Sequence, residues 1–306
     1  MTSIETYGRR IFALPPASFF VVSAVFHYLG PSFAVLLFVH VDVLGVAWLR
    51  IASAAVVFAL WRRPWRLVSR LNGRQCWVLL GLGAVLAAMN SLFYLAVDRL
   101  PLSTVGAIEF LGTVILAAIG TRTRRNVFAL LLAIGGVGAL TDVRIVDEPL
   151  GFVFAFANCA GFMLYVILGH KIANTNADGT SSEGASGAMS GIDQLGAAML
   201  VAAVVATPFG IGSAAATVFH PVWLLWGIGV GLCSSVIPYV TDQLAMARLP
   251  RATFALLLAI LPATATVIGL LVLRQVPTLQ DLIGIALVVI GVALHRERPT
   301  DEPQIV

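Results

Sequence analysis

Long apolar runs separated by short polar connections dominate this chain. Most of the runs approach 20 residues, about the length at which an α-helix crosses the roughly 30 Å hydrocarbon core of a bilayer. The pattern therefore predicts an all-α membrane protein with ten transmembrane helices. The predicted segments are 17–38, 43–61, 76–97, 102–120, 126–140, 150–169, 191–212, 221–244, 252–273 and 278–294.

Composition agrees with this pattern, because 59% of the residues are hydrophobic and only 11% are charged. The connections between runs are too short to form a separate aqueous domain. Lipid is therefore the solvent for most side chains. An ionisable residue at mid-bilayer costs roughly 2.5 to 3.5 kcal/mol unless it is paired, so each such residue becomes a functional candidate.

Basic residues predict the orientation in the cell or inner membrane. With a cytoplasmic amino terminus, fifteen of the 19 basic residues fall on the inner face, and the exceptions are Arg50, Arg99, Arg144 and Arg274. This asymmetry is the one expected from the positive-inside rule. Both termini of a multi-pass protein are thus predicted to be cytoplasmic.

Several kinds of chemistry have no matching pattern in the sequence. Cys76, Cys159 and Cys233 lie far apart in apolar context, and the five histidines are scattered among different segments. Neither set has the spacing of a metal site. A phosphate-binding glycine loop and a Ser/His/Asp arrangement are also missing. We therefore expect no enzyme, no metal, no cofactor and no nucleic-acid partner, but a small-molecule substrate, a lipid bilayer and a monomeric or homodimeric state.

A short internal repeat indicates two related halves. Residues 95–104 align with residues 244–253 at a constant offset of 149, with six identities in ten positions. The copies lie five predicted spans apart, so they cross the bilayer in opposite directions. Inverted repeats of this kind are typical of secondary transporters. We expect one five-helix half at 1–145 and another at 146–306, with a flexible cytoplasmic loop at 173–190 because that stretch is rich in Ser, Gly and Asn.

A resemblance to a known family rests on motifs spread over nearly the whole chain. They are Leu49-Arg50-Ile51, Trp61-Arg62-Arg63-Pro64-Trp65-Arg66, Met89-Asn90-Ser91-Leu92-Phe93-Tyr94-Leu95-Ala96, Leu100-Pro101-Leu102, Ile108-Glu109-Phe110 and Arg248-Leu249-Pro250. They resemble the EamA-type branch of the drug/metabolite transporter superfamily, and within it the threonine/homoserine exporters. The resemblance implies ten helices in two inverted halves, a central cavity, and export of amino acids or related metabolites.

Three positions depart from the pattern of that family. Thr113 stands where proline is frequent, Leu261-Pro262 where Glu-Pro is frequent, and Leu273-Arg274-Gln275 where Leu-Gly-Glu is frequent. The missing acidic residues point to altered coupling or cargo.

Arg50 and Glu109 are the main candidates for substrate recognition. Each lies about seven residues into its span from the outer end, or roughly 10 Å deep at 1.5 Å per residue. They are thus expected at the same level of the bilayer. Glu109 is predicted either to contact substrate or carry a proton, or to pair with Arg50.

Polar residues on other spans are further candidates for substrate binding. Asn90 and Tyr94 are four residues apart and share a helix face, and Asn158 and Tyr165 are seven apart and do the same. Tyr239 follows Pro238, which we expect to kink its helix, as we also expect of Pro262. Hydrogen bonding between helices is the alternative role for these side chains.

Other polar residues carry a plainer interpretation. Asp193 and Asp242 are placed near the cytoplasmic ends of their spans, where a charged side chain reaches water. His27 is expected to be a packed histidine rather than a proton relay.

Together these observations predict a secondary transporter that exports a small polar metabolite by alternating access. Threonine or homoserine is the expected cargo, with proton coupling through Glu109 as an option. A membrane scaffold or sensor that transports nothing, and an exporter of drugs or other metabolites, are the alternatives.

Overall fold

The computed structural model describes residues 16–65, 73–120, 123–141, 148–177, 185–246, 257 and 260–294. Within these ranges the chain is helical and contains no strand, which confirms the all-α prediction. The elements are α2 (Pro16–Leu37), α3 (Val43–Arg62), α5 (Gly73–Val97), α6 (Leu102–Gly120), α7 (Arg124–Thr141), α8 (Pro149–Ala177), α9 (Ala185–Ala215), η1 (Ala216–Phe219), α10 (Pro221–Gly231), η2 (Leu232–Val236), α11 (Ile237–Met246), α13 (Leu261–Leu273) and α14 (Leu279–Leu294).

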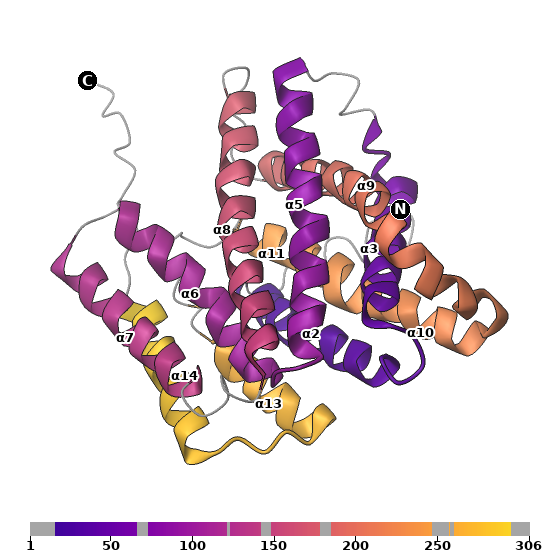
Figure 1. The fold of residues 1–306 in the computed structure, drawn as a ribbon. Coiled ribbons are helices and arrows are strands. Elements are labelled where there is room, and N and C mark those ends of the chain that lie inside the picture. The colour runs from indigo at the N-terminus through magenta and orange to yellow at the C-terminus, as the bar shows by residue number, and fades with distance from the viewer. Residues whose placement is uncertain are drawn as a thin grey trace, which may run out of the picture.

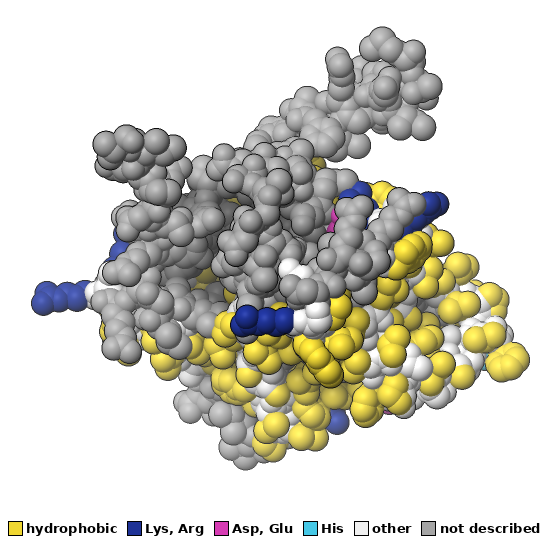
Figure 2. All heavy atoms as spheres, turned by 90° about the horizontal axis from the view of Figure 1, so that it is seen from above, with side chains coloured by type: hydrophobic (Ala, Val, Ile, Leu, Met, Phe, Trp, Pro, Cys, Tyr) yellow, Lys and Arg dark blue, Asp and Glu magenta, His cyan; other side chains and the backbone are white. Residues whose placement is uncertain are grey.

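The outer surface of the helix bundle is apolar. Large hydrophobic side chains such as Trp77, Leu60 and Phe209 are each at least 70% exposed. Figure 2 shows that hydrophobic side chains cover most of the coloured surface. Among the described residues, six helical stretches are long and apolar enough to cross a membrane, and three shorter helices are also apolar. A multi-pass membrane protein follows, while the count of ten spans stays a prediction.

Local sequence signals set the limits of α3, the helix that carries Arg50. The Asp42 side chain accepts a hydrogen bond from Leu44 N at 3.2 Å and caps the first turn. At the other end, Arg63 adopts a left-handed conformation with φ of 50°, and its N–H bonds to the Ala59 carbonyl. Pro64 then prevents the helix from continuing.

α3 packs against α9 (Figure 1), and two side-chain contacts show that the helices run in opposite directions. Trp48 Nε1 donates to Thr207 Oγ1 at 3.0 Å, and Arg62 pairs with Asp193 through two bonds of 2.7 and 3.0 Å. The two contacts are 14 residues apart on each helix, or about 21 Å of rise. α3 and α9 are therefore joined near both of their ends, and Asp193 is an ion-pair partner rather than only a water-facing residue.

α7 and α14 form a second close pair, at the lower left of Figure 1. Small residues allow the approach: a Cβ on Gly284 would lie 2.8 Å from the Gly136 carbonyl, and one on Gly291 would lie 2.7 Å from the Ala129 carbonyl. Small residues at such contacts are the usual means of close helix packing in membranes. α5 and α8 pack side by side as a third pair in the middle of the same view.

Two elements differ from the sequence prediction. α8 extends to Ala177 and α9 begins at Ala185, so both ends of the stretch expected to be a flexible loop are helical, and 178–184 lies outside the described residues. α13 begins at Leu261, so Pro262 occupies its first turn, where a missing N–H costs nothing, rather than interrupting a described helix. The second copy of the internal repeat, from residue 247 onward, also lies outside the described residues.

Candidate substrate cavity

A π-helical turn, η2, divides predicted span eight into α10 and α11. It covers Leu232–Val236 and ends just before Pro238. Each turn of this kind leaves backbone carbonyls and side chains in positions that a regular α-helix does not offer, and such turns are frequent at functional sites. The expected irregularity in this span is present, but it precedes the proline by a turn and exposes Ser234 and Ser235 to α3.

Arg50 is anchored by these two serines. Its Nε donates to Ser235 Oγ at 3.0 Å, and its Nη2 donates to the Ser234 carbonyl at 3.2 Å. The guanidinium lies over the Tyr94 ring, 5.2 Å from the ring centroid. Gly231 makes this approach possible, because a Cβ there would lie 2.7 Å from the Arg50 carbonyl.

This anchoring leaves part of the guanidinium available. A guanidinium has five N–H donors in a planar fork, and these contacts engage only Nε and Nη2. Arg50 is only 5% exposed, so its charge is buried, and within the described part of the chain it has no carboxylate partner within 4.0 Å. Such a preorganised cation suits a carboxylate ligand, which a guanidinium binds through two parallel hydrogen bonds.

Glu109 lies on α6 and lines the same cavity as Arg50. It is 5% exposed, and its Oε2 has no hydrogen-bond partner among the described residues. In the described part of the chain, ion pairs form at Arg62–Asp193 and at Arg99–Asp98, whereas Arg50 and Glu109 form none within 4.0 Å. The direct pairing that was one of the two expectations for Glu109 is absent from this structure.

The space that atoms leave free between these charges, including its open mouth, amounts to about 410 Å³. Six elements contribute to its wall, and the lining residues are His27 and Pro31 from α2, Arg50 from α3, Met89, Asn90 and Phe93 from α5, Glu109 from α6, Asn158, Phe162 and Tyr165 from α8, and Tyr239 from α11.

Six of the seven residues predicted to bind substrate thus line one cavity. They are Arg50, Asn90, Glu109, Asn158, Tyr165 and Tyr239. The seventh, Tyr94, is fully buried beneath the Arg50 guanidinium and supports it instead.

The two cavity asparagines have different hydrogen-bonding states. Asn90 Nδ2 donates to the Leu86 carbonyl at 2.7 Å, within its own helix. Asn158 is fully buried beside Glu109, with whose carboxyl group its amide interacts, although among the described residues no atom meets full hydrogen-bond geometry with either polar atom of the amide. A buried polar group without a partner is unusual in a folded protein and costs about 1 to 3 kcal/mol. The Asn158 amide carries two N–H donors and an oxygen acceptor, and it lines the same cavity as Glu109.

Sequence reasoning did not find Ser234, Ser235 or the aromatic wall formed by Phe93 and Phe162. A pair of serines inside a long apolar run was the available signal for the first two. His27, expected to be packed, does line the cavity. Its ring meets the Tyr28 ring edge-on, with 5.1 Å between the two ring centroids. A set of three or more His, Cys, Asp or Glu side chains able to hold a metal is not found among the described residues.

Comparisons with known proteins agree with the resemblance seen in the sequence. The model of the EamA-like transporter family matches residues 179–296. The chain is 30% identical to the threonine/homoserine exporter RhtA of Escherichia coli over 264 residues, which is 85% of this chain and 84% of the relative. The exporter of the same name from Salmonella typhimurium is 30% identical over 283 residues, covering 90% and 89% of the two chains.

A solved protein crystal structure shares the fold, with a TM-score of 0.57 over 91% of this chain and 96% of that one at 17% sequence identity. The level of identity to the curated exporters over most of the chain, together with the family match, decides the classification. The chain belongs to the EamA-like transporter family and is a multi-pass membrane exporter similar to RhtA.

Proposed function

We propose that this protein exports a small zwitterionic metabolite, an amino acid such as threonine or homoserine, by alternating access through the cavity that holds Arg50 and Glu109. The names of the curated relatives support this cargo, since both are threonine/homoserine exporters. The observation that carries the proposal is the presence of two buried, opposite charges that line one cavity without pairing.

Charge balance supports a zwitterion over other solutes. An isolated buried charge is expensive in low dielectric, and a bound ligand that carries both charges compensates both ends of the site at once. In the proposed complex, Arg50 binds the carboxylate of the amino acid and Glu109 binds its ammonium group. Asn158 then supplies a donor and an acceptor for a side-chain hydroxyl. A purely hydrophobic drug would leave the buried charges of Arg50 and Glu109 uncompensated.

The packing of the helices supports two halves that move against each other. α3 packs with α9, and α7 packs with α14, so the second and fifth helices of one proposed half contact their counterparts in the other. The fourth helix of each proposed half also contacts the first helix of the other half, since α6 contacts α8 and α13 contacts α2. This reciprocal pattern is expected if residues 1–145 and 146–306 are related by an inverting twofold axis. Rocking about the α3–α9 contact would then open the cavity to each side in turn.

Efflux from reconstituted protein tests this proposal. Proteoliposomes loaded with radiolabelled threonine, homoserine, a cationic drug or a neutral sugar should release the two amino acids only when the protein is present. Arg50→Gln and Glu109→Gln should each reduce threonine efflux at least about tenfold, because each leaves a substrate charge unpaired. Arg74→Gln, which removes an exposed arginine at the start of α5, should not change it.

The panel also separates the alternatives. Release of the drug but not of the amino acids would support a drug exporter. Release of no solute by correctly folded protein would favour a scaffold or sensor. Efflux of threonine that is unchanged in both Arg50→Gln and Glu109→Gln would refute the role assigned to this cavity.

A further inference from the structure

A stripe on α6 carries one residue that lines the substrate cavity and one that lines a second pocket. Ser103, Gly106 and Glu109 are spaced three residues apart, so they follow one side of the helix with about 4.5 Å of rise between neighbours. Glu109 lines the substrate cavity, and Ser103 lines the second pocket. Gly106, between them, has no side chain to block the space.

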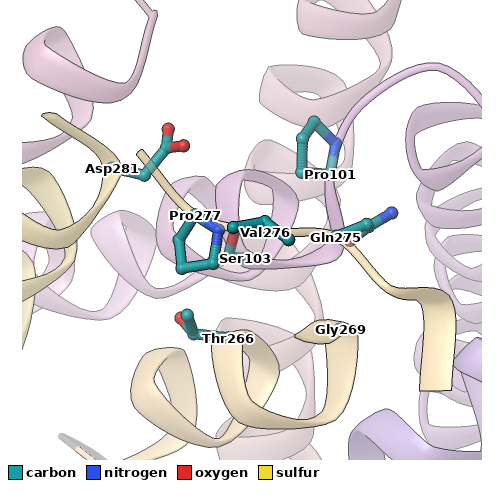
Figure 3. Close-up of a pocket in the computed structure, with 8 residues that line it drawn as sticks. All are labelled: Pro101, Ser103, Thr266, Gly269, Gln275, Val276, Pro277 and Asp281. Carbon is teal, nitrogen blue, oxygen red and sulfur yellow. The ribbon is translucent and has the colours of Figure 1, made fainter. Parts of the chain in front are cut away.

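The second pocket, which we call the α13–α14 pocket, has an empty volume of about 270 Å³. Figure 3 shows Thr266 and Gly269 on α13 on one side of it, and the connection from Gln275 to Pro277 running across it. Gln275 Oε1 accepts a hydrogen bond from Leu102 N at 3.1 Å and thereby holds this connection to the start of α6. The basic-residue pattern predicts that this end of the bundle faces the outside of the cell.

Tyr28 of α2 lies against Gly106, the residue of this stripe between Ser103 and Glu109. A Cβ on Gly106 would lie 2.8 Å from Tyr28 Oη, so the hydroxyl rests directly against the glycine. Tyr28 is fully buried, and its hydroxyl has no hydrogen-bond partner among the described residues. Glu109, one helical turn deeper, likewise has an oxygen, Oε2, without a hydrogen-bond partner among the described residues. Ordered water commonly satisfies buried polar groups that have no protein partner and bridges one such group to another.

The titratable and charged groups around Glu109 come from several elements. Arg50 on α3, Tyr28 on α2, Cys159 on α8 and Tyr239 on α11 interact with it electrostatically. His27 and Tyr165 line its cavity, and Asp281 on α14 lines the α13–α14 pocket. Of these side chains, Tyr28 supplies the three atoms nearest to a Cβ on Gly106, which lies on α6 between Ser103 of one pocket and Glu109 of the other. We therefore take the Tyr28 hydroxyl as the connection between the two pockets.

We propose that the Tyr28 hydroxyl relays protons between the α13–α14 pocket and Glu109, and so couples export to the proton gradient. This inference rests on the proposed function. In the inward step, the hydroxyl donates its proton to the Glu109 carboxylate through the intervening water and accepts one from water on the side of Ser103. One proton moves inward, the hydroxyl ends neutral, and Glu109 becomes a neutral acid that no longer holds an ammonium group.

The test compares two transport modes in proteoliposomes. Exchange of internal for external radiolabelled threonine needs no net proton movement, whereas accumulation driven by a pH gradient does. Tyr28→Phe should keep exchange within about twofold of the wild type and should slow accumulation driven by the pH gradient at least about tenfold, because a positioned proton donor contributes at least that much to a transfer rate.

The matched control is Thr104→Val. Thr104 is also fully buried on α6 and its hydroxyl also lacks a partner among the described residues, but it projects from nearly the opposite side of the helix from Gly106. We expect this variant to keep both modes. Gly106→Ala, which would displace the Tyr28 hydroxyl, should behave like Tyr28→Phe, and Gly135→Ala, where an added Cβ meets nothing within 4 Å, should behave like the wild type.

The outcomes are distinct. Accumulation driven by the pH gradient that is equal in the wild type, Tyr28→Phe and Gly106→Ala would overturn the relay. So would a wild type that exchanges threonine but does not respond to the gradient, although the proposed export function would survive that result. A wild type that neither exchanges nor accumulates any amino acid would reject the export function itself. Gly106→Ala keeps the test open if Tyr28→Phe fails to fold.

Discussion

The two serines of η2 should differ in their importance although they are adjacent. Ser235 holds Arg50 through its side chain, whereas Ser234 holds it through its backbone carbonyl. Substitution by alanine removes the first contact and preserves the second. The Ser234 hydroxyl makes only a 3.5 Å contact with Tyr94 Oη. Ser235→Ala should therefore weaken substrate binding, and Ser234→Ala should have little effect.

The expected size follows from the contact that is lost. A hydrogen bond to a charged group contributes about 1.5 to 3 kcal/mol in soluble proteins, and interhelical bonds in membranes contribute less, up to about 1.7 kcal/mol. Ser235 is fully buried, so water does not replace its hydroxyl, and we take about 1.4 kcal/mol. This corresponds to a roughly tenfold higher KM for threonine. For Ser234→Ala the contact is at the limit of hydrogen-bond length, and we expect a change below about twofold.

The assay is the initial rate of threonine exchange in proteoliposomes as a function of external threonine. Ser53→Ala is a suitable control, because the Ser53 hydroxyl bonds to the backbone carbonyls of its own helix at Leu49 and Arg50 and does not touch the guanidinium. Equal KM values for Ser234→Ala and Ser235→Ala would refute this account of how Arg50 is held. A larger effect of Ser234→Ala would refute it as well.

Three further predictions concern charge and packing. Glu109→Gln should fold and insert but lose the pH dependence of transport, and pH-dependent export at the wild-type rate by this variant would contradict its role. Arg62→Ala and Asp193→Ala should each lower the free energy of unfolding by about 1 kcal/mol. Because both substitutions break the same ion pair, the double variant should lose clearly less than the sum of the two, and strict additivity in thermal unfolding would contradict this pairing. Gly284→Ala should lower the free energy of unfolding by about 1 to 3 kcal/mol, because the added methyl group forces α14 away from α7. Gly135→Ala should leave it unchanged, and equal melting temperatures for the two variants would contradict the close contact at Gly284.

The sequence predicted most of the residues that line the cavity, but not the contacts that hold them in place. Depth along the spans placed Arg50 and Glu109 at one level, and helical spacing placed Asn90 on an inward face, because both inferences need only the rise and period of an α-helix. Hydropathy cannot reveal a π turn, since the residues of η2 are as apolar on average as their neighbours. The contacts of Arg50 with Ser234 and Ser235 therefore could not be predicted from hydropathy.

Gln275 illustrates a second limit. From the sequence it is only a neutral residue where many relatives of this family carry an acid. In the structure its side chain accepts the hydrogen bond of Leu102 N, which is an otherwise unpaired donor in the first turn of α6. The contact joins residues 173 positions apart, and no local pattern encodes such a pairing. The composition of 173–190 predicted a flexible loop, whereas α9 already begins at Ala185. Alanine and methionine in this stretch favour a helix.

The π turn also fixes the rotational phase of everything that follows it in α11. A π turn contains one residue more than the α-helical turn that it replaces, so each later side chain is rotated by about 100° relative to an uninterrupted helix. Tyr239 lines the cavity with this extra residue in place. Deleting a single position within 232–236 would thus turn the tyrosine out of the cavity wall and withdraw the carbonyl that holds Arg50, so the length of this short segment is as constrained as its composition.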